Sequence, residues 1–132
     1  MFPLKEIFNF SKISMKAKFE IELLPEVIDF LDDLDEKSRD KIYYNFKKSQ
    51  FINDSEIFKK LNENIWEFRT LYNGNSYRLF AFWDKTSKME TLVISTHGIV
   101  KKTQKTPLNE ITKAEEIRKE YFTHKINKQN ER

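Results

Sequence analysis

Large apolar side chains alternate with charged ones near the beginning of the chain, over residues 18–23. An alternation of period two is typical of a strand with one buried face, so we expect a first strand here. After Pro25 the apolar residues recur at helical spacing, which predicts a helix over residues 25–34. Asp35 and Glu36, in the segment 35–37, supply acidic residues that favour the start of a second helix, which continues to about Gln50. These two helices are expected to form a hairpin.

The middle of the chain changes to a strand pattern. A short helical turn is predicted first, over residues 57–61. Two aromatic-rich strands follow at 65–72 and 76–83, and the Asn-Gly-Asn sequence at 73–75 separates them. Asn-Gly is a strong hairpin signal because both residues accept a positive φ. A polar turn and a further strand at 92–96 complete this region.

The last patterned segment begins at Thr106-Pro107 and predicts a helix with one apolar face that includes Tyr121. The predicted order is therefore β-α-α-β-β-β-α. Strands and helices segregated in this way indicate an α+β domain. We expect a mostly antiparallel sheet that is covered by helices on one face, with the other face left free for function.

A chain of 132 residues is long enough for one modest core but too short for two ordinary domains. Met15 would itself make a plausible chain start, so we treat residues 1–14 as an amino-terminal extension or an upstream start. The domain then spans residues 15–122. A polar, basic tail over residues 123–132 follows it.

Composition excludes several classes of site. The chain has no cysteine and only two histidines, which argues against disulfides, thiolate chemistry and a structural metal site. No apolar run is long enough to span a bilayer, and we expect a cytoplasmic protein with no membrane partner. The chain has 24 Lys and Arg residues and 21 Asp and Glu residues, so its net charge is small. The distribution of charge therefore says more about nucleic-acid binding than the net charge does.

Basic side chains gather at one end of the predicted sheet. Strand alternation places Arg69 beside Glu67, and it places Arg78 near the end of a partly apolar face, where an arginine needs a partner or an anionic ligand. The strand at 92–96 is expected to end at His97. A loop without acidic residues follows, and it carries Lys101, Lys102 and Lys105.

Each of these residues also has a plainer interpretation. Arg69 could simply form an ion pair with Glu67, and Arg78 could extend to solvent from a sheet edge. A lysine-rich loop is usually just solvated. His97, directly before Gly98, could do no more than shape a turn.

Three runs of sequence are familiar in combination: WEFR at 66–69, NGNSYRLF at 73–80 and HGIVKKTQKTP at 97–107. They closely resemble the phage-derived, HigB-like branch of the RelE/ParE toxin superfamily. The resemblance covers about residues 16–122. It implies a RelE-like fold and the toxin of a type II toxin-antitoxin system.

The resemblance also implies an activity. Toxins of this kind that are endoribonucleases cut mRNA, typically on the translating ribosome, without a metal or other cofactor. An antitoxin partner is implied, commonly with a helix-turn-helix domain. The hypothesis assigns phosphate contacts to Arg69 and Arg78, acid or base catalysis to His97, and stabilisation of developing charge to Lys101. Further RNA contacts are assigned to Lys102, Lys105 and Lys60.

Two other functions remain open from the sequence. The first is the ParE-like activity of the same fold, in which the protein inhibits DNA gyrase. The second is an inactive toxin-like module that binds nucleic acid or an antitoxin. The cationic set on the sheet favours RNA cleavage, because a purely protein-binding surface has no need for paired arginines beside a histidine.

Overall fold

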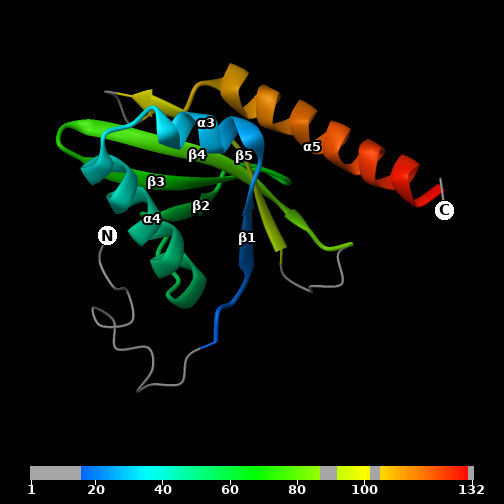
Figure 1. Cartoon of the computed structure of the whole chain (residues 1–132), viewed down its shortest axis with the longest axis horizontal. Helices are drawn as coiled ribbons and strands as arrows, with labels where there is room; N and C mark the ends of the chain where they lie inside the picture. The colour runs from blue at the N-terminus through cyan, green and yellow to red at the C-terminus, as the bar shows by residue number, and fades with distance from the viewer. Residues whose placement is uncertain (1–15, 87–91, 102–104, 131–132) are drawn as a thin grey trace.

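The structure is a computed structural model of the chain, and it describes residues 16–86, 92–101 and 105–130 (Figure 1). The predicted extension, residues 1–14, therefore lies outside the described residues. In the described part, helices and strands follow one another as β1-α3-α4-β2-β3-β4-β5-α5. The predicted α+β class is confirmed.

A single mixed sheet has the strand order β1-β5-β4-β3-β2. β1 (Glu20–Leu23) runs parallel to β5 (Leu92–Lys101). All other neighbours are antiparallel: β5 with β4 (Asn75–Asp84), β4 with β3 (Trp66–Tyr72), and β3 with β2 (Phe58–Lys60). The expectation of a mostly antiparallel sheet is thus also confirmed.

β3 and β4 form the predicted hairpin around Asn73 and Gly74. Their φ angles are 52° and 80°, the positive values that a two-residue turn between twisted strands requires. Because the turn fixes the register, Arg69 lies directly opposite Arg78.

Two helices, α3 (Pro25–Asp32) and α4 (Glu36–Phe51), cover one face of the sheet. Pro25 begins α3 as predicted, and Asp35 caps α4 by accepting a hydrogen bond from the Ser38 N–H at 3.1 Å. Apolar side chains of both helices form one core with the strands beneath them. Its members include Val27, Leu31, Ile42, Phe46, Phe68, Tyr77, Leu79 and Ala81.

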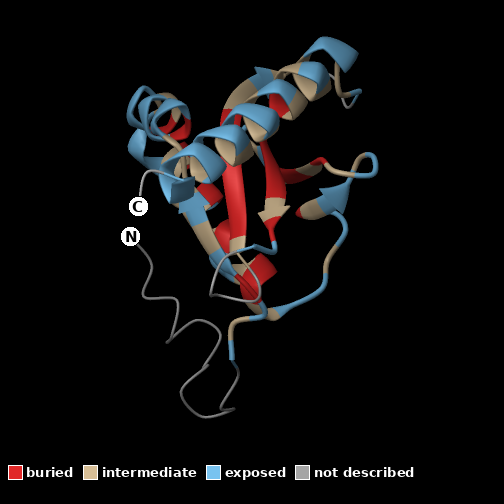
Figure 2. Ribbon diagram, turned by 90° about the vertical axis from the view of Figure 1, so that its right-hand side faces the viewer, coloured by how far each residue is buried: buried red, intermediate tan, exposed pale blue. Residues whose placement is uncertain are grey.

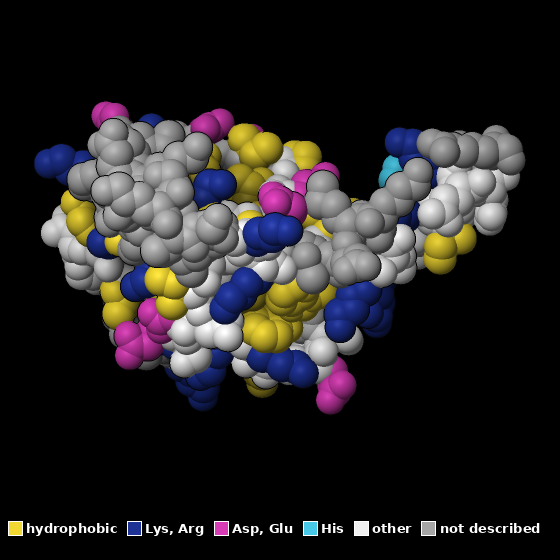
Figure 3. Space-filling model, turned by 90° about the horizontal axis from the view of Figure 1, so that it is seen from below, with side chains coloured by type: hydrophobic (Ala, Val, Ile, Leu, Met, Phe, Trp, Pro, Cys, Tyr) yellow, Lys and Arg dark blue, Asp and Glu magenta, His cyan; other side chains and the backbone are white. Residues whose placement is uncertain are grey.

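The last helix, α5 (Leu108–Asn130), lies across the opposite face of the sheet, above buried strands (Figure 2). A second core joins its Ala114 to Phe80, Phe82 and Ile94. The expectation that helices cover only one face is therefore wrong. The helix also continues into the predicted tail, and its end projects beyond the sheet (Figures 1 and 3). None of the helices in the described ranges is long and apolar enough to cross a membrane.

Residues 58–60 form a strand, β2, where a helical turn was predicted over 57–61. β2 pairs with β3, and the ring of Phe58 stacks on the rings of Phe68 and Trp66 at centroid distances of 4.3 and 4.8 Å. Packing against a neighbouring strand overrides the local spacing of apolar residues, and that spacing alone does not reveal the neighbour.

β5 extends to Lys101 and is longer than the predicted strand at 92–96. His97 therefore lies inside the strand and not at its end. Gly98 packs against α3, where an added Cβ would come within 2.6 Å of the Phe30 ring. The close approach of Phe30 therefore explains why residue 98 is a glycine. Because His97 lies inside β5, the interpretation in which it shapes a turn is wrong.

Candidate functional site

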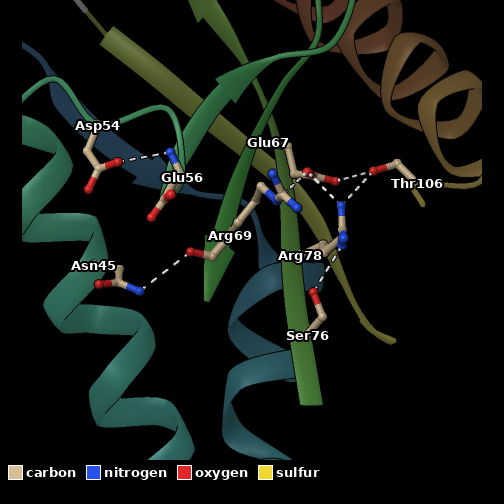
Figure 4. Close-up of polar contacts among 8 residues, drawn as sticks. All are labelled: Asn45, Asp54, Glu56, Glu67, Arg69, Ser76, Arg78 and Thr106. Atoms are coloured by element: carbon tan, nitrogen blue, oxygen red, sulfur yellow. Dashed lines mark hydrogen bonds and ion pairs between the residues drawn. The ribbon is translucent and has the colours of Figure 1, made fainter. Parts of the chain in front are cut away.

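Two arginines face each other across the β3–β4 hairpin, on the face of the sheet that α5 covers. Arg69 and Arg78 are direct cross-strand partners, and Glu67 lies on the same face (Figure 4). Like charges directly opposite each other destabilise an antiparallel pair. Glu67 compensates, because its Oε1 lies 3.0 Å from Arg78 Nη1 and 3.4 Å from Arg69 Nε.

Arg78 is 1% exposed, and a hydrogen-bond network holds it in place. Its Nη1 donates to Glu67 Oε1 and to Thr106 Oγ1 at 2.9 Å, and its Nε donates to Ser76 Oγ at 3.1 Å. The Thr106 hydroxyl in turn donates to Glu67 Oε2 at 2.7 Å. The network ties the two central strands to the segment just before α5 (Figure 4). A direct contact between Arg78 and a phosphate requires this segment to move.

Three other cations on or beside this face are more accessible. The side chain of Arg69 is 20% exposed. Lys101 ends β5 opposite Ser76, so it shares the face of Arg78, and it is half-buried. Lys105 is exposed in the segment before α5. We call Arg69, Arg78, Lys101 and Lys105 the cationic cluster, and Glu67 is the carboxylate that the structure shows at its centre.

His97 lies further along β5, underneath α5, and is 1% exposed. Its ring stacks on Phe80 at a centroid distance of 4.8 Å. Burial lowers the pKa of His97, Lys113 adds to this effect and Glu110 opposes it, so the imidazole is neutral at neutral pH. Nδ1 shares a hydrogen bond with the Thr96 hydroxyl at 3.0 Å. Nε2 has no hydrogen-bond partner in the part of the chain that is described, and it lies 3.7 Å from Glu110 Oε2.

Of the other predicted RNA-binding lysines, one lies apart from the cationic cluster and one falls outside the described residues. Lys60 pairs with Trp66 at the beginning of β3 and lines a separate hollow. Lys102 lies outside the described residues. Over the described ranges, no group of three or more His, Asp or Glu side chains is placed to hold a metal ion.

Two contacts of this site go beyond the sequence-based expectations. The expected partner of Glu67 is Arg69, but Arg78 also pairs with it, and the two-residue turn is the signal that places both arginines within reach of that carboxylate. Thr106 is expected only as a helix start, whereas the Thr106 hydroxyl bridges Arg78 and Glu67. No local pattern identifies Thr106, because its partners come from strands far away in the sequence.

The mixed five-stranded sheet, with three helices in the described part and a cationic cluster beneath the last of them, is consistent with a RelE-like fold. The chain belongs to the family described as Phage derived protein Gp49-like (DUF891), whose model matches residues 29–119. This family is associated with RelE-like and other toxin-like proteins. No curated protein matches the chain.

Proposed function

We propose that the protein is the toxin of a type II toxin-antitoxin system, from the HigB-like branch, and that it cleaves mRNA on the ribosome. The observation that carries the proposal is the cationic cluster. Arg69 and Arg78 stand directly opposite each other, Lys101 shares their face, and Glu67 is the carboxylate paired with the arginines. Like charges opposite each other reduce the stability of a sheet. Binding of a polyanion such as RNA would offset this repulsion, which supports a role for the arginines in RNA binding.

The chemistry needs cations and proton transfer. The ribose 2′-hydroxyl attacks the adjacent phosphorus, the bond to the 5′-oxygen breaks, and the products carry a cyclic phosphate and a free 5′-hydroxyl. One proton leaves the attacking hydroxyl and one reaches the departing oxygen. Fixed positive charge around the phosphate stabilises the transition state.

The contacts and exposure of the described side chains suggest how the residues divide this work. Arg69 and Lys101, the more accessible members on the strands, contact the scissile phosphate, and Lys105 and Lys102 hold flanking phosphates. Arg78 acts from the buried network and reaches the phosphate only when the Thr106 segment moves.

His97 is proposed as the proton acceptor. Burial keeps its imidazole neutral and therefore able to accept a proton, and its Nε2 is not committed to a hydrogen bond within the described ranges. His97 is covered by α5. The movement of the segment before α5 that exposes Arg78 to RNA therefore also has to expose His97.

The proposal implies three partners in the cytoplasm. These are mRNA, the ribosome that presents it, and an antitoxin with a helix-turn-helix domain that blocks the cationic cluster. No small-molecule cofactor takes part in the proposed reaction, since the attacking group belongs to the RNA itself.

Expression of the chain alone in a bacterial host tests this proposal. We expect growth arrest, and primer extension on total RNA should reveal new 5′ ends within translated reading frames. Arg69→Ala and Lys101→Ala should abolish both effects. Lys47→Ala removes an exposed lysine from α4, on the other face of the sheet, and should leave both effects intact.

Two results would contradict the proposal. Growth arrest with intact mRNA and an induced DNA damage response would indicate a gyrase inhibitor. Normal growth with the folded protein present at high level would indicate an inactive module. Circular dichroism of each variant separates loss of activity from loss of fold.

A further inference from the structure

Both tryptophans of the chain lie together at the end of the sheet away from the Asn73-Gly74 turn. Trp66 begins β3, and Trp83 lies near the end of β4. Their ring centroids are 5.8 Å apart at an interplanar angle of 77°, and both side chains are only half-buried. Half-buried indoles that contact each other form a rigid aromatic surface with an exposed side.

The two indoles line a hollow of about 650 Å³, which we call the tryptophan hollow. Phe122 of α5 adds a third aromatic ring to its lining. The volume is within the range of pockets that hold small ligands, roughly 300–1,000 Å³. The hollow can therefore take a group of the size of a nucleotide.

Basic side chains also line the tryptophan hollow: Lys60 from β2, Lys85 after β4, and Arg118 from α5. Lys60 and Lys85 are exposed, and no ion pair engages either of them in the described ranges. Arg118 contacts Glu115 at 3.3 Å and lies over the ring of Phe122. Glu63 adds one carboxylate to the lining, so positive charge predominates.

Hydrophobic and basic side chains also occur together on the surface of the molecule seen from below Figure 1. Hydrophobic side chains are exposed in the middle of this view, with lysines and arginines around them (Figure 3). An aromatic platform flanked by cations is the arrangement that binds single-stranded nucleic acid, in which bases stack on rings and phosphates meet the cations. A purely apolar partner would gain nothing from Lys60 and Lys85.

We infer that the tryptophan hollow is a second RNA subsite, in which a base of single-stranded RNA stacks against Trp66 and Trp83. Lys60, Lys85 and Arg118 then hold the adjoining phosphates. This inference rests on the proposed function for its ligand class. The five residue steps from Arg78 to Trp83 span about 16 Å along β4, so the subsite holds the RNA some nucleotides away from the cationic cluster.

The two tryptophans make the subsite directly observable. Because the chain has only these two, its intrinsic tryptophan fluorescence reports on the surroundings of Trp66 and Trp83. We expect a short single-stranded oligoribonucleotide to quench the fluorescence of the full chain saturably, more weakly at higher salt. A ribose-phosphate oligomer of the same length without bases should bind and quench much less, because it cannot stack.

Charge-removing variants provide the second arm. Replacing both lysines, Lys60→Ala with Lys85→Ala, should weaken binding and reduce the slope of log affinity against log salt by about 2. The matched control is Lys47→Ala with Lys119→Ala, which removes two exposed lysines elsewhere and should leave the slope unchanged. Both double variants keep the two tryptophans, so the readout stays the same.

Three outcomes would overturn the inference: no saturable quenching, equal quenching by the oligomer without bases, or an unchanged salt slope in the Lys60 and Lys85 variant. Stronger quenching by an acidic peptide than by RNA would also overturn it and indicate a protein-docking surface. These outcomes are distinguishable from failure of the proposed function. Quenching without mRNA cleavage would reject only the proposed nuclease activity. Cleavage without quenching would reject only the proposed subsite.

Discussion

Glu67 is the residue on which the charge balance of the cationic cluster depends. It is 0% exposed, and it contacts Arg69, Arg78 and Thr106. Removing one partner of a buried ion pair leaves an uncompensated charge, which costs far more than the pair itself contributes. Glu67 therefore keeps two opposed arginines compatible with a folded sheet.

Glu67→Gln should lower the free energy of unfolding by about 3 kcal/mol, because the neutral amide removes the buried carboxylate that pairs with both Arg69 and Arg78. Urea denaturation measures the change. The matched control is Glu116→Gln on the exposed side of α5, which should alter stability by less than about 0.5 kcal/mol. Equal stabilities of the two variants would show that the ion pairs of Glu67 with Arg69 and Arg78 do not hold the sheet together.

His97 predicts a pH dependence of stability. The folded state holds its pKa below the ordinary value of 6.5, so the unfolded chain takes up the proton first as the pH falls. The stabilisation is complete above pH 6.5 and is lost as the pH falls towards the folded pKa. In chemical denaturation at a series of pH values, the parent and His124→Gln should lose stability in this window, and His97→Gln should not. His124 is the exposed control. A loss that persists in His97→Gln would refute the assignment.

How much of the site the sequence predicts depends on the distance between partners along the chain. The Asn-Gly turn fixes the register of β3 and β4, so the opposition of Arg69 and Arg78 follows from the sequence alone. The contact of Phe30 with Gly98 and the hydrogen bond between Thr106 and Arg78 do not follow from the sequence alone. Such contacts depend on where a helix docks, which local spacing does not specify.

α5 is the element that closes one face of the sheet, and Asp84 anchors its second half. Asp84, at the end of β4, accepts hydrogen bonds from Tyr121 at 2.6 Å and from Lys125 at 2.7 Å. Burial opposes ionisation of Asp84, but donors on Lys125, Thr86 and Tyr121 outweigh it and hold its pKa far below the ordinary value. The carboxylate thus stays charged and fixes α5 to the sheet.

Asp84→Asn should loosen this half of α5 and reduce the free energy of unfolding by about 3 kcal/mol. The substitution removes the buried negative charge that forms an ion pair with Lys125. Hydrogen exchange should become faster in the second half of the helix. Glu120→Gln, an exposed change on the same helix, is the control and should leave exchange unaltered. Unchanged exchange in Asp84→Asn would mean that the apolar contacts alone hold α5.

The elements themselves were largely predictable, and the exceptions have a common cause. The hairpin, the helices α3 and α4 and the start of α5 follow from turn residues, caps and apolar spacing. β2 was predicted as a helical turn, and α5 was expected on the same face as the other helices. In both cases a neighbour distant in sequence decides the outcome: Phe68 and Trp66 for β2, and the core around Phe80 for α5.

In the part of the chain that is described, the molecule has two basic regions, which lie toward opposite ends of the sheet. The cationic cluster lies near the Asn73-Gly74 turn and the start of α5, and the tryptophan hollow lies where β4 ends. We propose that Arg69, Arg78 and Lys101 in the first of these regions together serve the cleavage of mRNA. The second region, by the inference above, positions the same strand of RNA.

The most direct test combines the purified protein with translating ribosomes and a defined mRNA, followed by mapping of the RNA ends. We predict cuts within the reading frame that carry 5′-hydroxyl ends. The cuts should require the ribosome, disappear in Arg69→Ala and in Lys101→Ala, and persist in Lys47→Ala. Intact mRNA under these conditions, or cleavage that survives loss of both Arg69 and Lys101, would contradict the account.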